Sequence, residues 1–212
     1  MDIGKANLYA MGMIIPIAVI FIFPFLLIWG TDPIQSCFNN NISVIWIFIL
    51  TGIVMHELLH GITWALFTKK KFKSIRFGIN WKFITPYCHC KEPLKVSHYL
   101  AGAAMPLIVL GLTPVIISFL SGNGEAFCFG VFFTWSAGGD VIAIFAMRKL
   151  KKETLVLDHP EKLGFYIFEK EDKNYENNSI HFHYTKHDHR MWWQFKPRKH
   201  GLFAGGKLYL SR

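Results

Sequence analysis

Long apolar blocks alternate with short polar segments along this chain. Four such blocks occupy residues 8–29, 42–67, 98–120 and 124–147. Each is long enough to supply the roughly 20 residues that an α-helix needs to cross the hydrocarbon layer of a bilayer. The first block is also too long for the apolar region of a secretory signal peptide, and no small-residue cleavage site follows it. The pattern therefore predicts about four transmembrane helices, all retained.

The pattern changes in two places. Residues 72–96 alternate apolar with polar positions and contain the turn signal Gly78-Ile79-Asn80, which predicts a small β-hairpin. From about residue 170 the sequence is rich in Asn, His, Lys and Asp and loses any period, which predicts a flexible tail. The expected fold class is an all-α integral membrane protein with a small β-hairpin between helices two and three.

This organisation gives three parts. Residues 1–41 hold the first transmembrane helix and an outer loop, and residues 42–150 form a membrane core with the hairpin and three further helices. Residues 151–212 form a cytoplasmic C-terminal segment. The hydrophobic content of 52% exceeds ordinary globular usage and agrees with a membrane class.

The charge distribution predicts the orientation in the cell membrane. The net charge of +9 could indicate a nucleic-acid partner, but Lys and Arg gather beside the apolar blocks, at residues 69–71 and 148–152. The loops at residues 30–41 and 121–125 contain neither Lys nor Arg. Because basic residues favour the cytoplasmic side, both termini are predicted to be cytoplasmic. The expected partners are membrane lipid and a substrate, and no nucleic acid.

The second apolar block contains the motif His56-Glu57-Leu58-Leu59-His60. Two histidines four residues apart lie one helical turn apart on one face, as two ligands of a tetrahedral Zn²⁺ must. The glutamate of such a motif is the general base that accepts a proton from the attacking water. An ionisable residue at mid-bilayer costs about 2.5–3.5 kcal/mol, so its presence favours function. The alternative is that the three polar side chains only contact neighbouring helices.

Asp140 is the predicted third metal ligand, because it is the one formally charged residue in the interior of the fourth block, where Glu125 lies at the edge. His60 and Asp140 each lie seven residues before the cytoplasmic end of their block, which places both at the same depth on parallel helices. Gly138-Gly139 would allow a close approach or an unwound turn there. His98 and Glu92 are the competing ligands, both near the water boundary.

These motifs resemble those of the site-2-protease-like intramembrane zincins, and more closely those of the bacterial zincin peptidase family DUF3267. The resemblance covers about residues 45–167, and its remaining elements are Thr85-Pro86-Tyr87-Cys88-His89-Cys90, Ala101-Gly102-Ala103-Ala104-Met105-Pro106, Ala137-Gly138-Gly139-Asp140 and Leu157-Asp158-His159-Pro160. It implies that Asp140 completes the metal site, that residues 102–106 form the glycine-rich motif of a middle helix, and that the hairpin presents the substrate. The middle motif lacks the asparagine common in site-2 proteases.

The expected function is an intramembrane zinc metalloprotease that hydrolyses peptide bonds of a peptide or membrane-protein substrate near the cytoplasmic leaflet. Glu57 is its catalytic base, and His56, His60 and Asp140 are its metal ligands. The alternatives are a zinc-binding membrane protein without proteolytic activity, such as a transporter or scaffold, and an inert membrane module.

Other residues suggest weaker chemistry. Cys88-His89-Cys90 could bind a second metal ion, but three adjacent donors do not reach one tetrahedral ion without strain, and structural roles are favoured. The four cysteines predict no disulfide framework. The tail could bind metal weakly through His181, His183, His187, His189 and His200. Met191-Trp192-Trp193 could lie at the membrane surface.

Overall fold

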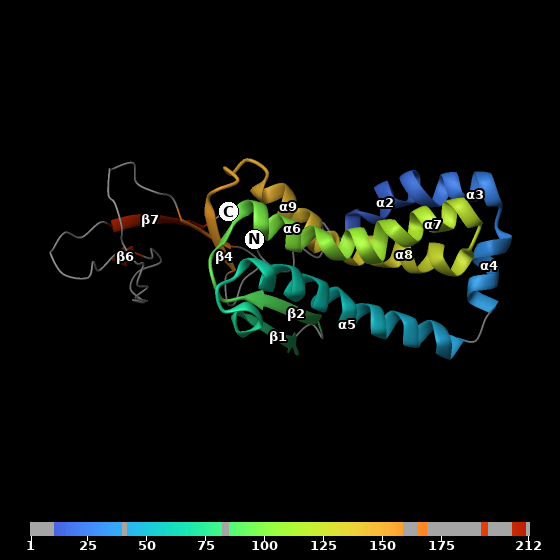
Figure 1. Cartoon of the computed structure of the whole chain (residues 1–212). Coiled ribbons are helices and arrows are strands. Elements are labelled where there is room, and N and C mark those ends of the chain that lie inside the picture. The colour runs from blue at the N-terminus through green and yellow to red at the C-terminus, as the bar shows by residue number, and fades with distance from the viewer. Residues whose placement is uncertain are drawn as a thin grey trace.

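A computed structural model describes residues 11–39, 42–81, 85–158, 165–168, 192–194 and 205–210. Helices form the long axis of the molecule, and strands gather at one end (Figure 1). The helical elements are α2 (Ile14–Ile17), η1 (Ala18–Ile22), α3 (Phe23–Trp29), α4 (Asp32–Asn39), α5 (Ile42–Phe67), η2 (Lys71–Ser74), α6 (Val96–Pro106), η3 (Leu107–Leu112), α7 (Thr113–Ser121), α8 (Gly124–Ser136) and α9 (Gly138–Met147). The strands are β1 (Ile75–Asn80), β2 (Thr85–Cys90), β3 (Leu94–Lys95), β4 (Leu155–Asp158), β5 (Phe165–Phe168), β6 (Trp192–Gln194) and β7 (Gly205–Leu210).

Two helices are long and apolar enough to cross a membrane, Ile45–Phe67 and Val96–Ser121. Two bent pairs meet the same criteria when each pair is taken as one span. In the first pair Asp32–Asn39 is bent by 102° from Ile14–Trp29, and in the second Gly138–Met147 is bent by 46° from Gly124–Ser136. The described residues thus contain two to four candidate spans, in agreement with the apolar blocks.

Two helices contain short π-helical turns, each of which ends two residues before a proline. The ring of a proline removes one backbone donor and collides with the carbonyl four residues earlier. In η1 and η3 the hydrogen bonds shift to the wider spacing, from the Phe23 amide to Ala18 O and from the Thr113 amide to Ile108 O. The Thr113 hydroxyl also donates to Ile108 O at 2.8 Å. Pro24 and Pro114 are therefore accommodated without breaking their spans.

The predicted outer loop is largely helical, which corrects its assignment as a loop. The chain turns at Gly30, whose φ of +72° favours glycine, and α4 then lies across the end of the bundle (Figure 1). Asp32 and Pro33 occupy the first turn of α4, where an acidic side chain and a residue without an amide donor are both favourable. The segment is too short and too polar to show the period of a membrane helix.

The β-hairpin is confirmed and pairs β1 with β2 in antiparallel register, with Ile75 opposite Cys90 and Asn80 opposite Thr85. It packs against α5. The fold is mostly helical, as the fold class predicted, but it is not all-α apart from the hairpin, because a second sheet has the strand order β3-β4-β5-β7-β6. Its strands β3, β4 and β5 are only two to four residues long, too short for a period to be recognised.

The second sheet joins chain segments that flank the helices. Strand β3 runs directly into α6, and β4 follows α9. Val96, Met147, Val156 and Phe165 form a buried cluster between these elements. Strands β6 and β7 pair within the segment predicted to be a flexible tail, while residues 169–191 and 195–204 of that segment lie outside the described part of the chain.

Candidate metal site

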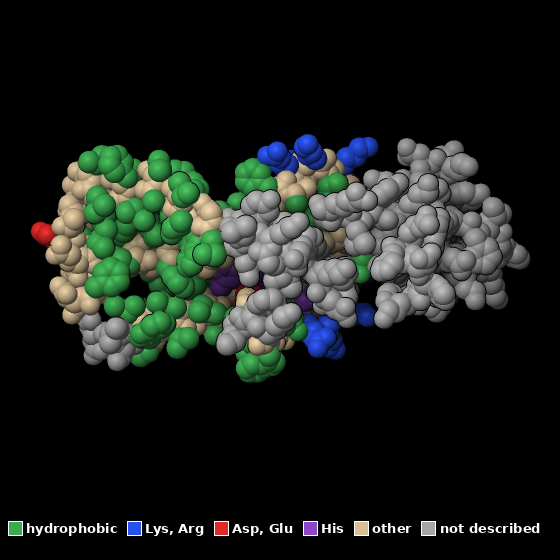
Figure 2. Space-filling model, turned by 180° about the vertical axis from the view of Figure 1, so that it is seen from behind, with side chains coloured by type: hydrophobic (Ala, Val, Ile, Leu, Met, Phe, Trp, Pro, Cys, Tyr) green, Lys and Arg blue, Asp and Glu red, His purple; other side chains and the backbone are tan. Residues whose placement is uncertain are grey.

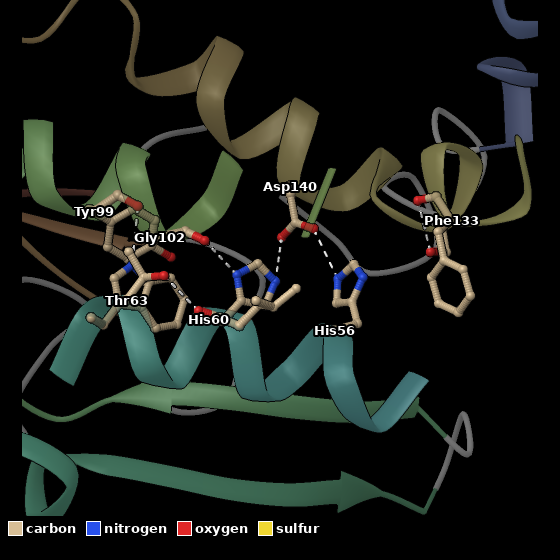
Figure 3. A network of polar contacts seen from close by, with 10 residues as sticks. His56, His60, Thr63, Tyr99, Gly102, Phe133 and Asp140 are labelled. Atoms are coloured by element: carbon tan, nitrogen blue, oxygen red, sulfur yellow. Dashed lines mark hydrogen bonds and ion pairs between the residues drawn. The ribbon is translucent and has the colours of Figure 1, made fainter. Parts of the chain in front are cut away.

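Side chains from two helices converge on one point between α5 and α9. Nε2 of His56 lies 3.2 Å from Oδ2 of Asp140, and Nε2 of His60 lies 3.2 Å from Oδ1 of the same carboxylate. One ligand atom from each residue can be chosen so that all three atoms lie within 4.8 Å of one another. Figure 3 shows both imidazoles directed from α5 toward the Asp140 carboxylate. The structure thus brings together the three residues predicted to bind the metal.

Helix geometry explains the convergence. His56 and His60 lie four residues apart on the continuous helix α5, and their rings meet at 78° with centroids 4.9 Å apart. The other span breaks at Ala137, so Asp140 lies in the first turn of α9. Helix α6 packs against both α5 and α9. The break lies immediately before Gly138-Gly139, where the sequence predicted an unwound turn or a close approach.

His60 is oriented by a backbone carbonyl. Its Nδ1 lies 2.9 Å from Gly102 O, and because a carbonyl oxygen only accepts, Nδ1 carries the proton. In the neutral ring Nε2 then presents a lone pair to Asp140, also an acceptor. Two facing acceptors repel each other unless a proton or cation lies between them. This arrangement is the one that metal-ligating histidines adopt, with the second nitrogen donating to a fixed carbonyl.

The ligand spacing also fits zinc. Tetrahedral Zn²⁺ with bonds of about 2.0–2.2 Å to nitrogen and oxygen separates neighbouring ligand atoms by about 3.3 Å. The two His–Asp distances of 3.2 Å, one to each oxygen of the Asp140 carboxylate, are close to that value. Two imidazoles and one carboxylate form a donor set typical of catalytic zinc, with a fourth position for water or substrate. The residues present therefore fit the ion.

An aromatic stack supports His60 from behind. The His60 ring stacks on Trp64 with centroids 5.2 Å apart, and Trp64 stacks on Tyr99 at 5.1 Å. Nε1 of Trp64 donates to Tyr99 O at 3.1 Å. A Cβ atom at Gly102 would lie 2.0 Å from Trp64 Nε1, so only glycine permits this close approach. Trp64 was missed from the sequence, although its position one turn after His60 is a usable signal.

His56 is less restrained than His60. Its Nδ1 is buried and has no hydrogen-bond partner among the residues that the structure describes. The ring contacts His60 edge to face, and its Nε2 faces Asp140. The two histidines of the motif therefore differ, because a second hydrogen bond fixes the orientation of His60 alone.

Glu57 lies beside this group but does not belong to it. The three clustered ligands are His56, His60 and Asp140, and Glu57 interacts electrostatically with all of them. The backbone amide of Cys88, in β2, donates a hydrogen bond to the Glu57 carboxylate. The hairpin thus reaches the edge of the site next to the predicted base.

The competing ligands lie in other environments. Glu92 accepts hydrogen bonds from the Ser74 hydroxyl at 2.6 Å and the Lys69 amide at 3.0 Å, and it closes the turn after α5. Partial burial alone would raise the pKa of Glu92. The hydrogen bonds outweigh this effect and lower the pKa below its ordinary value. His98 stacks on Phe67 with centroids 4.1 Å apart. Neither residue belongs to the ligand group.

The remaining candidates are dispersed or undescribed. Cys90 is buried in a cluster with Trp64, Ala65, Ile75 and Leu94, and its thiol donates to Glu92 O at 3.3 Å. Cys88 packs against the same cluster. The tail histidines and Met191 lie outside the described residues, as does His159 of the family motif.

Comparison with protein families places this site within a known group. The model of the family DUF3267, described as "Putative zincin peptidase", matches residues 49–155. The matched region is more than half of the chain and includes most of α5, the hairpin, α6 to α9 and the start of β4. Comparisons with curated proteins and with solved structures give no match. The chain therefore belongs to the DUF3267 family.

Proposed function

We propose that the protein is a zinc metalloprotease embedded in the cell membrane, which hydrolyses peptide bonds of a peptide or membrane-protein substrate near the cytoplasmic leaflet. The convergence of His56, His60 and Asp140 at one point, with Glu57 beside them, carries this proposal. Family membership supports a zinc peptidase. Action within the membrane, in the manner of site-2 proteases, extends the proposal beyond the family.

The zinc ion would be held by Nε2 of His56, Nε2 of His60 and a carboxylate oxygen of Asp140. Zinc bound in such a site lowers the pKa of water toward about 7 and polarises a carbonyl group. Gly102 O and Trp64 fix the ring of His60 in position for this role. The oriented ring keeps its lone pair directed at the site.

Glu57 acts as general base and then as general acid. Its carboxylate accepts a proton from the attacking water and delivers it to the nitrogen of the leaving amine. The Cys88 amide holds the carboxylate beside the site, so the base is positioned before substrate binds. By resemblance to site-2 proteases, we infer that the hairpin β1–β2 aligns the substrate next to Glu57.

The exposed surface of the helices supports the membrane setting. Figure 2 shows hydrophobic side chains spread over one half of the molecule, while Lys and Arg gather beyond that half. Exposed apolar side chains occur along every candidate span, among them Ile20, Leu27, Phe48, Leu66, Leu120 and Phe145. A soluble protein rarely exposes an apolar surface of this extent, whereas a bilayer would cover it. The basic side chains support an orientation with both termini in the cytoplasm.

The test is cleavage by purified protein reconstituted in lipid vesicles, with a panel of transmembrane peptides and a measurement of bound zinc. Glu57→Gln should keep the zinc and lose turnover by about 10²–10⁴-fold, because only proton transfer is removed. Equal cleavage by the variant and the wild type would overturn the mechanism. Zinc uptake into the vesicles without cleavage of any peptide would favour a transporter.

A further inference from the structure

Two cysteines meet at the end of the bundle opposite the strands. Cys37 lies in the last turn of α4 and is buried, while Cys128 lies near the start of α8 and is half-buried. Both are free thiols, and their side chains form a hydrogen bond with each other. The two thiols come from segments far apart in the sequence, so their spacing along the chain does not reveal the contact.

The backbones that bear these thiols are in close contact. Helices α4 and α8 pack directly against each other, and a Cβ atom at Gly124 would lie 1.7 Å from Pro33 O. Pro33 and Gly124 each lie four residues, about one helical turn, before the cysteine on their own helix. A disulfide typically joins Cα atoms about 4.4–6.8 Å apart, so two helices that carry one must pack directly against each other, as α4 and α8 do.

Aromatic packing holds α8 in place at this contact. Phe127, the neighbour of Cys128, stacks on Phe25 of α3 with centroids 3.8 Å apart. Phe119 of α7 contacts both of these rings. The thiols therefore approach each other within a packed framework.

We propose that Cys37 and Cys128 are a redox modification site, at which a small-molecule or protein disulfide donor oxidises the two thiols to a disulfide that joins α4 to α8. The loops beside both cysteines contain neither Lys nor Arg, so the orientation proposed above places them on the outer side, where disulfides persist. The chemical step itself does not depend on the proposed protease activity.

The reaction is a thiol–disulfide exchange in two steps. The thiolate of the more exposed Cys128 attacks the S–S bond of the donor, forms a mixed disulfide and releases one donor thiolate. The thiolate of Cys37 then attacks the Cys128 sulfur and releases the second donor thiolate. The two thiol protons of the protein pass to these two leaving groups. The donor is reduced, and the two cysteines are oxidised to one disulfide.

The bridge would act on both segments that carry the candidate site. Helix α4 precedes α5, which carries His56 and His60, and α8 precedes α9, which carries Asp140. Oxidation would therefore tie the outer ends of the two ligand-bearing segments together through one covalent bond. Reduction would release them.

The experiment uses the full chain, purified in detergent under reducing conditions and then incubated with oxidised glutathione. Free thiols are alkylated, and the product is analysed by intact mass and by peptide mapping without reductant. The chain has four cysteines, and oxidation should lower the number of alkylated thiols from four to two. The peptide map should show Cys37 linked to Cys128, and dithiothreitol should restore all four thiols.

Two variants provide matched controls. The double variant Cys88→Ala/Cys90→Ala keeps only the proposed pair and should lose both alkylation sites after oxidation. Cys37→Ser removes the resolving thiol, so Cys128 should carry a stable glutathione adduct instead. The proposal is wrong if the wild-type map shows Cys37 and Cys128 unlinked after equilibration, or linked to other cysteines.

Discussion

The two ends of the helical bundle, named outer and inner after the proposed orientation, are built from different interactions. At the outer end, Phe25 is fully buried between Phe119 and Phe127, and the indole of Trp29 donates to Phe119 O at 3.2 Å. At the inner end, α5, α6 and α9 surround two imidazoles and a carboxylate. Apolar packing is sufficient to join helices, so the polar inner end requires another explanation. The inner end therefore has the composition of a chemical site, and the outer end that of a packed core.

Removing a ligand at the inner end should have the largest effect. His60→Ala should weaken zinc binding by about a thousandfold or more, because one of three protein ligands is lost. The affinity is measured by competition with a zinc chelator. His98→Ala is the matched control, because His98 stacks on Phe67 and is outside the ligand group. Similar losses in both variants would contradict the assignment.

Truncation at the outer end should reduce stability instead. Phe25→Ala should lower the free energy of unfolding by about 3 kcal/mol, because a fully buried ring is removed, while zinc affinity stays unchanged. Phe48→Ala is the control, since Phe48 is 62% exposed on α5 and should have little effect. Thermal unfolding in detergent, followed by circular dichroism, compares the two. A loss of zinc in Phe25→Ala would show that the ends are not independent.

Indirect disruption of the inner end should have an intermediate effect. Gly102→Ala should weaken zinc binding about 10–100-fold, because the new methyl group displaces Trp64 and with it the support of His60. Gly139→Ala lies next to Asp140, but its Cβ would have no neighbour within 4 Å, so its zinc affinity should be normal. If Gly139→Ala lost more zinc affinity than Gly102→Ala, the proposed role of Gly102 in supporting His60 would be wrong.

The turn that closes the inner end should contribute least. The hydrogen bonds to the Glu92 carboxylate lower its pKa below the ordinary value of 4.5, so they stabilise the fold above about pH 4.5. This stabilisation is lost as the pH falls through the lowered pKa of the folded state. Glu92→Gln should therefore have a slightly lower melting temperature than wild type at pH 7. This gap in melting temperature should narrow on acidification. A gap that widens in acid would contradict this sign.

The candidate site could be predicted from the sequence because its residues are anomalous in their surroundings. His56, Glu57, His60 and Asp140 interrupt apolar blocks, and a simple count along two parallel helices predicted that His60 and Asp140 share a depth. The support of His60 was harder to predict. Gly102 and Trp64 are ordinary residues of apolar helices, and only the packing of α5 on α6 reveals their role.

Prediction of the fold succeeded for long segments and failed for short ones. The apolar blocks and the hairpin correspond to α5, the α6–α7 span and β1–β2. Helix α4 was taken for a loop, and the β3-β4-β5 part of the second sheet was missed. These short elements are stabilised by tertiary contacts, such as the cluster of Val96 with Met147, rather than by a local period.

X-ray absorption at the zinc edge of the purified protein identifies the atoms that bind the metal. Binding by His56, His60 and Asp140 predicts a spectrum of nitrogen and oxygen ligands at about 2.0–2.2 Å, with the outer-shell scattering of two imidazoles. The spectrum of Glu57→Gln should be nearly the same, because Glu57 is not a ligand. Sulfur ligands at about 2.3 Å would assign the metal to cysteines instead and would contradict a site of His56, His60 and Asp140.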